Sequence, residues 1–435
     1  MISPGSKITG EIKISPDIIT GLQQKIKNIS NFKGEIEKNL DEEVTEIIKV
    51  LLGGGVLLDS SDLHIEPESG RARLRARIDG ILQDVMFLDW KVYQNILSRV
   101  KLLSGIKLNI SDRPQDGRFS VLLKDSSIEI RVSTLPAEYG ESIVLRILNP
   151  KSLIEVETLG LRPNLLEILK SEIKKPNGMI IVTGPTGSGK TTTLYAFLKR
   201  IQKPEIKIIT IEDPIEYHLI GVSQTQVASE KGYDFANGLK SIMRQDPDVV
   251  LVGEIRDLET AKIALQAALT GHLVLSTLHT NDAAGTIARL QSLGEKPVNI
   301  APAINLIIAQ RLVRKICKEC RKLVPVSPSV LVKIKESLKE VSKKTKTPEI
   351  TSALKIPQIK GCPDCNSTGY RGRLGIFEAF LIDDELEQFI LASPSISALE
   401  EKAIKKGMMT MYQDGLIKVL EGVTTLEEVE RVTGE

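Results

Sequence analysis

The sequence is poor in aromatic residues and nearly balanced in charge, and both features bear on the possible function. Phe, Trp and Tyr make up 4% of the 435 residues, which disfavours the stacked aromatic platforms that bind single-stranded nucleic acids. There are 58 Lys and Arg against 56 Asp and Glu, so the net charge is +2 and does not attract a nucleic acid or an acidic partner. The 41% hydrophobic fraction is ordinary for a globular protein, and the length allows two or three domains.

Long hydrophobic runs are also missing. A membrane-spanning helix needs about 18 consecutive apolar residues, whereas the mostly apolar stretch Ile300–Ile308 ends before Gln310 and Arg311. The first residues, Met1–Gly5, lack the basic and apolar regions of a signal peptide. We therefore expect a cytoplasmic protein that is at most peripherally associated with the inner face of the cytoplasmic membrane.

The hydrophobic pattern divides the chain into four parts. Residues 1–40 are a short N-terminal segment of weak pattern, with a possible helix near Asp17–Asn28. Residues 41–150 are interpreted as a smaller α+β domain, residues 151–162 as a linker, and residues 163–435 as a larger α/β domain.

Within the smaller domain, alternating hydrophobic residues predict strands over Arg71–Ile78 and Ser127–Ser133. Helical spacing predicts helices over Asp41–Leu52 and Trp90–Leu103. We expect the first helix to end at Gly53-Gly54-Gly55, because glycine is typical just past the C-terminus of a helix.

In the larger domain, short apolar runs alternate with helical segments. The runs are Met179–Thr183, Ile206–Ile211, Val249–Val252 and Leu273–Thr277. This alternation predicts a parallel sheet with helices on both faces.

The most specific feature is Gly184–Thr191, which fits the G-x-x-x-x-G-K-[ST] pattern of a phosphate-binding loop. The loop follows an apolar strand and precedes a predicted helix over Thr192–Arg200, whose positive dipole end favours phosphate. Lys190 supplies a positive charge, and the Thr191 hydroxyl can bind Mg²⁺. A chance glycine-rich turn would lack this context. The predicted nucleotide-binding residues are Gly184, Pro185, Thr186, Gly187, Ser188, Gly189, Lys190, Thr191 and Thr192.

Glu254 is the candidate that would activate water. It follows the apolar run Val249–Val252, and a carboxylate just past such a strand can reach the Mg²⁺ or orient and deprotonate the attacking water. The alternative is an acidic N-cap for a helix over Leu258–Leu269, but Asp257 fits that role better.

A second group of carboxylates, Glu212, Asp213 and Glu216, follows the run Ile206–Ile211, and Pro214 stiffens the turn between them. The carboxyl ends of strands are where α/β proteins bind ligands. Glu216 is therefore a candidate that assists Glu254 or the metal, with an acidic turn of no function as the alternative.

Two of the four histidines flank the run Leu273–Thr277. We interpret His272 as structural. His279 lies past the end of the strand, among polar residues, where it could sense the γ-phosphate. The sequence leaves a structural role for His279 equally open.

The four cysteines form two C-x-x-C pairs about forty residues apart, which is wider than the usual zinc-ribbon spacing. Two such pairs that use every cysteine favour a tetracysteine zinc site over a redox pair, and a reducing compartment disfavours disulfides. A site closed by four ligands would be structural. The predicted zinc ligands are Cys317, Cys320, Cys362 and Cys365.

Taken together, these motifs resemble the secretion ATPase superfamily, specifically the assembly ATPases of type II secretion and type IV pili. The likeness runs from Asp41 to the C-terminus. Met243–Asp257 is similar to the family signature, Thr210–Glu216 to its aspartate box and Ser276–Asp282 to its histidine box. Further segments of the smaller domain look familial: Ser61–Pro67, Arg77–Gly80, Pro114–Arg118 and Gly140–Ser142. The tetracysteine element is similar to the assembly ATPases and absent from the pilus retraction ATPases.

The resemblance implies a RecA-like P-loop ATPase domain, a preceding PAS-like α+β domain and a zinc-binding insertion over residues 315–370. It also implies a hexameric ring that binds ATP, Mg²⁺ and Zn²⁺. In such rings arginines of the smaller domain reach the γ-phosphate, and the matching positions here are Arg131 and Arg146. An arginine that arrives in this way can raise the rate by about 10³–10⁵.

The resemblance thus implies a hexameric ATP hydrolase that drives assembly of a type IV pilus or a type II secretion pseudopilus. The expected partners are further copies of the chain, an inner-membrane platform protein and, indirectly, a pilin or pseudopilin, without direct nucleic-acid contact. Two alternatives stay open: a motor for competence-type DNA uptake, and a regulatory nucleotide-binding protein that hydrolyses little.

Overall fold

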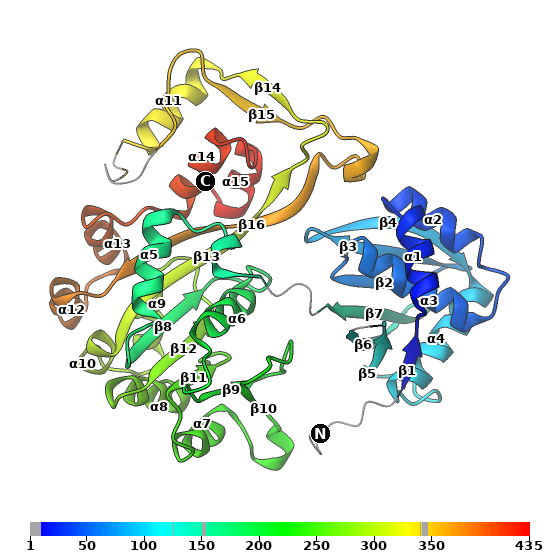
Figure 1. Cartoon of the computed structure of the whole chain (residues 1–435), viewed down its shortest axis with the longest axis horizontal. Helices are drawn as coiled ribbons and strands as arrows, with labels where there is room; N and C mark the ends of the chain where they lie inside the picture. The colour runs from blue at the N-terminus through cyan, green and yellow to red at the C-terminus, as the bar shows by residue number, and fades with distance from the viewer. Residues whose placement is uncertain (1–9, 125, 150–153, 340, 342–346) are drawn as a thin grey trace. The chain divides into compact units, whose positions relative to one another are not determined.

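The computed structural model describes residues 10–124, 126–149, 154–339, 341 and 347–435 (Figure 1). The chain divides into two compact units. The first holds the described residues up to Asn149 together with Cys317–Cys320 and Lys360–Arg371, and the second holds the remainder. Each unit has its own sheet.

The sheet of the first unit has seven strands in the order β1-β5-β6-β7-β2-β3-β4. Neighbouring strands are antiparallel, except that β1 runs parallel to β5. The strands are β1 (Glu11–Lys13), β2 (Asp62–Glu68), β3 (Arg71–Ile78), β4 (Ile81–Asp89), β5 (Gln115–Leu122), β6 (Ser127–Ala137) and β7 (Gly140–Leu148).

Helices pack on one face of this sheet and leave the charged positions on the other. Leu74 and Ala76 of β3 are buried, whereas Arg73 and Arg75, which alternate with them, are partly exposed, as the alternation in the sequence predicted. The helices are α1 (Pro16–Lys25), α2 (Ile29–Glu37), α3 (Val44–Leu57) and α4 (Trp90–Ser104). The predicted strand Arg71–Ile78 and the helix beginning at Trp90 are confirmed.

The prediction that α3 ends at Gly53-Gly54-Gly55 is wrong, because the helix continues through all three glycines to Leu57. A Cβ atom on Gly54 would lie 2.2 Å from Cε2 of Phe32, and one on Gly53 would lie 2.8 Å from Cδ1 of Leu22. The glycines are therefore sites of close packing between helices, and they do not act as a stop signal.

The N-terminal segment is part of the first unit as far as it is described. Ile12, Ile14, Phe32 and Ile36 are buried in the same core as the sheet. Residues 1–9 of the predicted segment lie outside the described residues. The elements β1, α1 and α2 therefore belong to the first unit, whereas the sequence pattern had indicated that this domain begins at residue 41.

The second unit contains a seven-stranded sheet in the order β10-β9-β11-β12-β8-β13-β16, in which the first six strands are parallel. The predicted parallel α/β architecture is confirmed. The strands are β8 (Gly178–Thr183), β9 (Ile208–Glu212), β10 (Ser223–Gln226), β11 (Val249–Val252), β12 (Leu273–Leu278), β13 (Ile304–Ile316) and β16 (Tyr370–Leu381).

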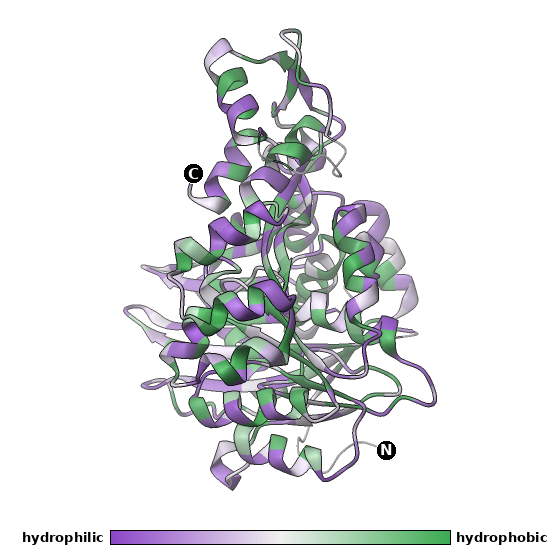
Figure 2. Cartoon of the chain, turned by 90° about the vertical axis from the view of Figure 1, so that its left-hand side faces the viewer, coloured by the Kyte–Doolittle hydropathy of each residue, from purple (hydrophilic) through white to green (hydrophobic). Residues whose placement is uncertain are grey.

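Helices cover both faces of this sheet. On β8, Met179 and Ile181 belong to one core, and Ile180 and Val182 belong to the other. In Figure 2 the surrounding helices carry alternating hydrophilic and hydrophobic residues, as expected for helices with one buried side. These helices are α5 (Pro163–Glu172), α6 (Lys190–Ile201), α7 (Phe235–Met243), α8 (Leu258–Leu269), α9 (Gly285–Ser292), α10 (Pro297–Ile300), α12 (Asp384–Leu391), α13 (Ile396–Lys405), α14 (Met411–Leu420) and α15 (Leu426–Thr433).

A small extension follows the first cysteine pair. It consists of the antiparallel strands β14 (Lys322–Pro325) and β15 (Lys355–Gln358) and the helix α11 (Pro328–Ser337). None of the helices among the described residues has the length and hydrophobicity needed to cross a membrane.

The described part of the predicted linker packs within the second unit. Leu159 is buried, and its carbonyl accepts a hydrogen bond from the N–H of Gly375 at 3.1 Å. The guanidinium of Arg162 pairs with the buried Asp414 at 2.8 Å. Residues 151–153 of the predicted linker lie outside the described residues.

Candidate active site

The phosphate-binding loop connects the end of β8 to the start of α6, as predicted. Gly184, Gly187 and Gly189 have φ angles of 149°, 80° and 89°, which residues with a side chain rarely adopt. A Cβ atom on Gly184 would also lie 2.6 Å from the carbonyl oxygen of Gln310 on β13. Gly184 is thus required both by its backbone conformation and by the neighbouring strand, whereas Gly187, which has nothing within 4 Å of an added Cβ, is required by its backbone conformation alone.

Two buried polar groups in this loop fit a phosphate ligand. Lys190 is 9% exposed, and its Nζ donates to the carbonyl oxygens of Gly184 at 2.8 Å and Pro185 at 3.1 Å. The hydroxyl of Ser188 is buried without a hydrogen-bond partner, which is costly unless a ligand satisfies it. Because the loop also opens a helix, its residues suit the phosphates of a nucleotide. Thr191 and Thr192 follow in the first turn of α6.

Glu254, His279 and Lys190 come together beside the loop. Oε2 of Glu254, just past β11, lies 3.3 Å from Nε2 of His279, just past β12. The Glu254 side chain is 14% exposed, and its other oxygen pairs with Arg256. Strands β11 and β12 are parallel neighbours, so their carboxyl ends carry both groups to one edge of the sheet.

Burial and the charges in this cluster lower the pKa values of Lys190 and His279. Burial lowers the pKa of Lys190 to about 8, although the negative charge of Glu254 opposes the shift. Burial and the positive charge of Lys190 lower the pKa of His279, again against Glu254. Arg256 is a site residue that the sequence did not reveal. It lies within the quoted family signature, but no role was predicted for it. Its exposed guanidinium pairs directly with Glu254.

The predicted N-cap is confirmed. The Asp257 side chain accepts hydrogen bonds from the N–H of Thr260 at 2.8 Å and from its hydroxyl at 3.0 Å, and α8 spans Leu258–Leu269. Glu254 therefore does not cap this helix, and it faces His279 and Arg256.

The aspartate box places its carboxylates in different environments. Glu212, the last residue of β9, is 3% exposed, and burial raises its pKa. The nearby negative charge of Glu216 raises the pKa of Glu212 further. Asp213 lies near enough to Arg256 to help raise the pKa of that guanidinium. The two loops that carry Glu254 and the aspartate box therefore adjoin at this edge of the sheet.

The predicted arginines lie in the sheet of the first unit. Arg131 on β6 is directly opposite Arg146 on β7. The strands on either side extend this pair into a row of charged residues across the sheet, with Arg118 of β5 opposite Arg131 and Asp62 of β2 opposite Arg146. Arg77 of β3 pairs with Asp62 on its other side. The family resemblance had given a role at the γ-phosphate only to Arg131 and Arg146. It had quoted Asp62, Arg77 and Arg118 within familial segments without a role, because the strand register that aligns them is not visible in a sequence.

Asp62 holds Arg146 in place. Its Oδ1 lies 3.0 Å from Nε of Arg146, and its Oδ2 lies 3.4 Å from Nε of Arg77. The side chain of Asp62 is 6% exposed, whereas that of Arg146 is 58% exposed. Arg146 is thus anchored at one nitrogen and accessible at the rest of its guanidinium.

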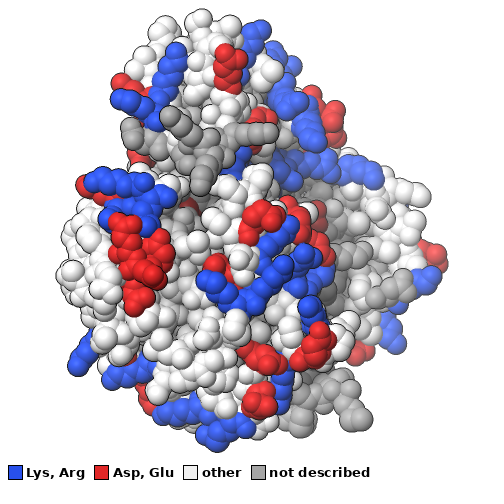
Figure 3. All heavy atoms as spheres, turned by 60° about the vertical axis from the view of Figure 1, so that its left-hand side comes forward, with Lys and Arg blue, Asp and Glu red and all other residues white. Residues whose placement is uncertain are grey.

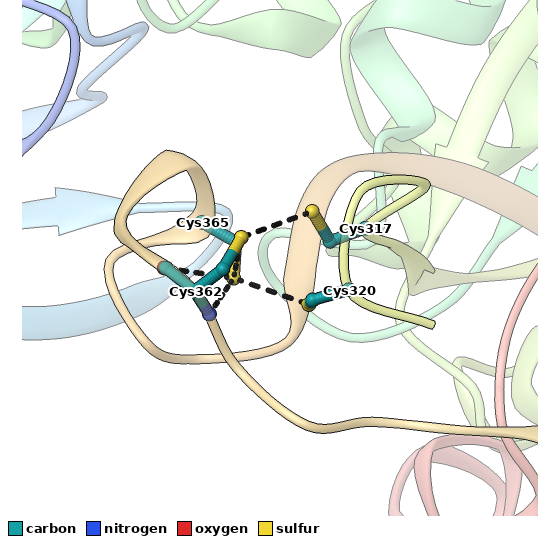
Figure 4. A group of neighbouring side chains, drawn as sticks. All are labelled: Cys317, Cys320, Cys362 and Cys365. Atoms are coloured by element: carbon teal, nitrogen blue, oxygen red, sulfur yellow. Dashed lines mark hydrogen bonds between the residues drawn. The ribbon is translucent and has the colours of Figure 1, made fainter. Parts of the chain in front are cut away.

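The four cysteine sulfurs converge (Figure 4). All four Sγ atoms lie within 4.8 Å of one another, with 3.8 Å between Cys317 and Cys362 and between Cys320 and Cys365. A tetrahedral ion with Zn–S bonds of about 2.3 Å requires sulfurs about 3.8 Å apart, whereas a disulfide requires about 2.05 Å. Backbone N–H groups of Cys362 and Gly369 donate to the Cys365 sulfur, each at 3.2 Å. The geometry therefore fits a four-coordinate metal and does not fit disulfides.

Surface charge is mixed on the face of the molecule seen in Figure 3, where basic and acidic side chains are interspersed among uncharged ones. This agrees with the net charge of +2.

Comparison with known proteins identifies the family of this chain. The family model described as "Type II/IV secretion system protein" matches residues 36–431. The chain is 43% identical over 403 residues to the type II secretion system ATPase E of Vibrio cholerae, covering 92% of this chain and 77% of that protein. It is 43% identical over 392 residues to the type IV pilus assembly ATPase PilB of Thermus thermophilus, covering 90% of this chain and 43% of PilB. The chain thus spans less than half the length of PilB.

Solved structures show the same fold. A crystal structure of the pilus retraction motor PilT with bound ADP superposes with a TM-score of 0.59 at 26% identity, covering 88% of this chain and 96% of that one. The Legionella pneumophila ATPase DotB superposes with a TM-score of 0.64 at 22% identity, covering 89% of this chain and 95% of that one.

The fold and the site define a P-loop nucleotide-binding protein built on a parallel sheet. The chain belongs to the type II/IV secretion system protein family. The predicted superfamily is confirmed, and its relatives include ATPases of type II secretion and pilus assembly.

Proposed function

We propose that this protein hydrolyses ATP to drive assembly of a type IV pilus or a type II secretion pseudopilus. The observation that carries the proposal is the cluster of Lys190, Glu254 and His279 beside a phosphate-binding loop. The names of the relatives, type II secretion system ATPase E and PilB, support the process that the hydrolysis drives.

In this proposal the loop from Gly184 to Thr191 binds the phosphates, and Thr191 binds Mg²⁺. Bound Mg²⁺ would neutralise charge on the phosphate oxygens and hold the nucleotide in line for attack. Glu254 accepts a proton from the attacking water and orients it, and Glu216 assists Glu254 or the metal. His279 responds to the γ-phosphate through its contact with Glu254.

Arg131 and Arg146 complete the site in a ring of subunits, which we propose to be a hexamer. Their guanidinium groups would stabilise the charge that develops on the γ-phosphate as the ring closes. Each turnover would then move the smaller domain relative to the P-loop domain across residues 151–162.

We further propose that the four cysteines bind one structural Zn²⁺, and that the protein works at the cytoplasmic face of the inner membrane with a platform protein. Four thiolates close the coordination sphere and leave no position for a substrate. The metal would therefore stabilise this region and take no part in hydrolysis.

The decisive experiment compares steady-state ATP hydrolysis by the wild-type protein, Lys190→Ala and Lys199→Ala. Lys199 lies on the same helix but pairs with Glu155 at an exposed position, so it controls for loss of a positive charge on α6. We expect Lys190→Ala to lose at least about a hundredfold in rate and Lys199→Ala to stay near the wild type. Equal rates for all three proteins would overturn the proposal. A wild-type protein that binds nucleotide without turnover would instead support a regulatory role.

A further inference from the structure

Two buried polar residues next to the site have no role in the chemistry proposed above. Tyr195 lies on α6, five residues after Lys190, and is fully buried. Glu212 ends β9 and is 3% exposed. The Tyr195 hydroxyl donates a hydrogen bond to Oε2 of Glu212. The pair thus joins the helix that opens at the phosphate-binding loop to the strand that leads into the aspartate box.

The second oxygen of Glu212 organises the segment that follows the strand. Oε1 accepts hydrogen bonds from the hydroxyl of Thr210 at 2.6 Å and from Nε2 of Gln224 at 3.2 Å. The Gln224 side chain also donates to the carbonyl of Tyr217 at 3.0 Å and accepts from the N–H of Leu219 at 2.7 Å. The segment between β9 and β10, which includes Glu216, is therefore built around one buried carboxylate.

Tyr195 contacts the same segment from the side of α6. Its hydroxyl receives backbone hydrogen bonds from Tyr217 and Glu216. Its ring packs edge-on against the ring of Tyr217, with centroids 6.2 Å apart. Burial and the negative charge of Glu212 raise the pKa of Tyr195, so the phenol stays protonated and remains a donor.

We infer that Tyr195 and Glu212 are positioning residues that fix Glu216 relative to Lys190 and Thr191. This inference rests on the proposed ATP hydrolysis. Tyr195 sits one helical turn after Thr191, so a hydrogen bond from this turn to the aspartate box sets the distance between the metal-binding hydroxyl and the Glu216 carboxylate. Phosphate binding uses the backbone of the loop and Lys190, and does not depend on this link.

The test is Tyr195→Phe, which removes one hydroxyl and keeps the packed ring. Because a displacement of about 1 Å can cost about a hundredfold in rate, we expect kcat to fall about tenfold or more. We expect the Kd for Mg²⁺-bound ADP to change less than about twofold, and the Mg²⁺ concentration for half-maximal activity to rise. If Tyr195 had only a structural role, the substitution would lower thermal stability, and it would not lower kcat selectively while leaving the Kd for Mg²⁺-bound ADP unchanged.

Tyr233→Phe is the matched control. The Tyr233 hydroxyl donates to Thr225 on β10 at 3.0 Å, so this variant also removes a partly buried phenol bond near the same strands. Neither Tyr233 nor Thr225 lies on α6. We expect Tyr233→Phe to keep the wild-type kcat and Mg²⁺ requirement. Equal kcat values for the two variants, high or low, would overturn the inference.

Glu212→Gln and the double variant with Tyr195→Phe test whether the two residues act as a unit. If the hydrogen bond between them sets the geometry, the double variant should be about as slow as the slower single variant. If the fold losses in rate of the two single variants multiplied in the double variant, the two residues would have independent roles and the inference would be overturned. A wild-type rate for Tyr195→Phe with an inactive Lys190→Ala would remove this inference alone, whereas full activity of Lys190→Ala would remove the proposed function.

Discussion

Nε2 of His279 lies 3.3 Å from Oε2 of Glu254, at the carboxyl ends of two adjacent parallel strands. The contact connects the residue proposed to activate water with the loop that follows β12. That loop is in turn held against the end of β8, directly before the phosphate-binding loop, because the Thr183 hydroxyl lies 2.7 Å from the Thr280 hydroxyl and accepts the Thr280 N–H at 2.9 Å. A change at the γ-phosphate can therefore reach His279 through few contacts.

The pKa of Lys190 predicts how nucleotide binding depends on pH. In the free protein this pKa is lowered to about 8, so the ammonium loses its proton as the pH rises above that value. Bound phosphates favour the charged form, so above about pH 8 binding must take up a proton and weakens. We expect the Kd for an ATP analogue that resists hydrolysis to rise several-fold between about pH 7 and pH 9, measured by titration calorimetry.

Lys190→Arg is the control for this pH dependence. A guanidinium stays charged throughout that range, so the variant should bind more weakly but with an affinity that is flat in pH. A pH slope that is identical in the wild type and in Lys190→Arg would show that another group titrates.

The close packing of α3 predicts that alanine in place of Gly54 destabilises the protein. Gly54→Ala improves the helix propensity by about 1 kcal/mol, but its Cβ would lie 2.2 Å from Cε2 of Phe32. We expect overpacking to win and to lower the free energy of unfolding by about 1–2 kcal/mol net, measured by urea denaturation. Gly21→Ala on α1, where nothing lies within 4 Å of the new Cβ, should be neutral or stabilising. A stabilised Gly54→Ala would contradict the packing account.

Asp62 and its two arginines give a prediction about the first unit. Arg146→Ala should lower the ATPase rate of the assembled protein by about a hundredfold or more if this guanidinium reaches the γ-phosphate. Arg77→Ala removes the other partner of Asp62 and should leave most of the activity. Steady-state rates on matched oligomers decide the point, and equal losses in the two variants would indicate a structural effect of Asp62.

The cysteine cluster predicts one metal ion per chain. Elemental analysis of the purified protein should find about one zinc per chain, and Cys320→Ser or Cys365→Ser should lose it together with thermal stability. Lys318→Ala, at an exposed position between two ligands, should retain the metal. Full zinc content in both serine variants would contradict a four-thiolate site.

Much of the second unit could be predicted, because its determinants are local. The strand Val249–Val252 is continuously apolar, Asp257 caps the following helix, and the glycines of the loop have positive φ angles that only glycine adopts readily. Each signal lies within a few residues of the element it specifies. Glu254 and His279 were found for the same reason, since each directly follows a recognisable strand.

The features that could not be predicted depend on contacts between distant residues. Gly54 reads as a helix stop until Phe32 is seen against it. Arg118 aligns with Arg131 only through the register of β5 and β6. The bond between Tyr195 and Glu212 requires knowing that α6 packs beside the end of β9.

The most direct test of the account is a paired measurement on Glu254→Gln. The substitution keeps the size of the side chain and removes the base, so the variant should bind Mg²⁺-bound ATP as tightly as the wild type while its hydrolysis rate falls about a hundredfold or more. Titration calorimetry and a single-turnover assay on the same preparation measure both quantities. A variant that binds and hydrolyses like the wild type would contradict the assignment of Glu254 and the mechanism built on it.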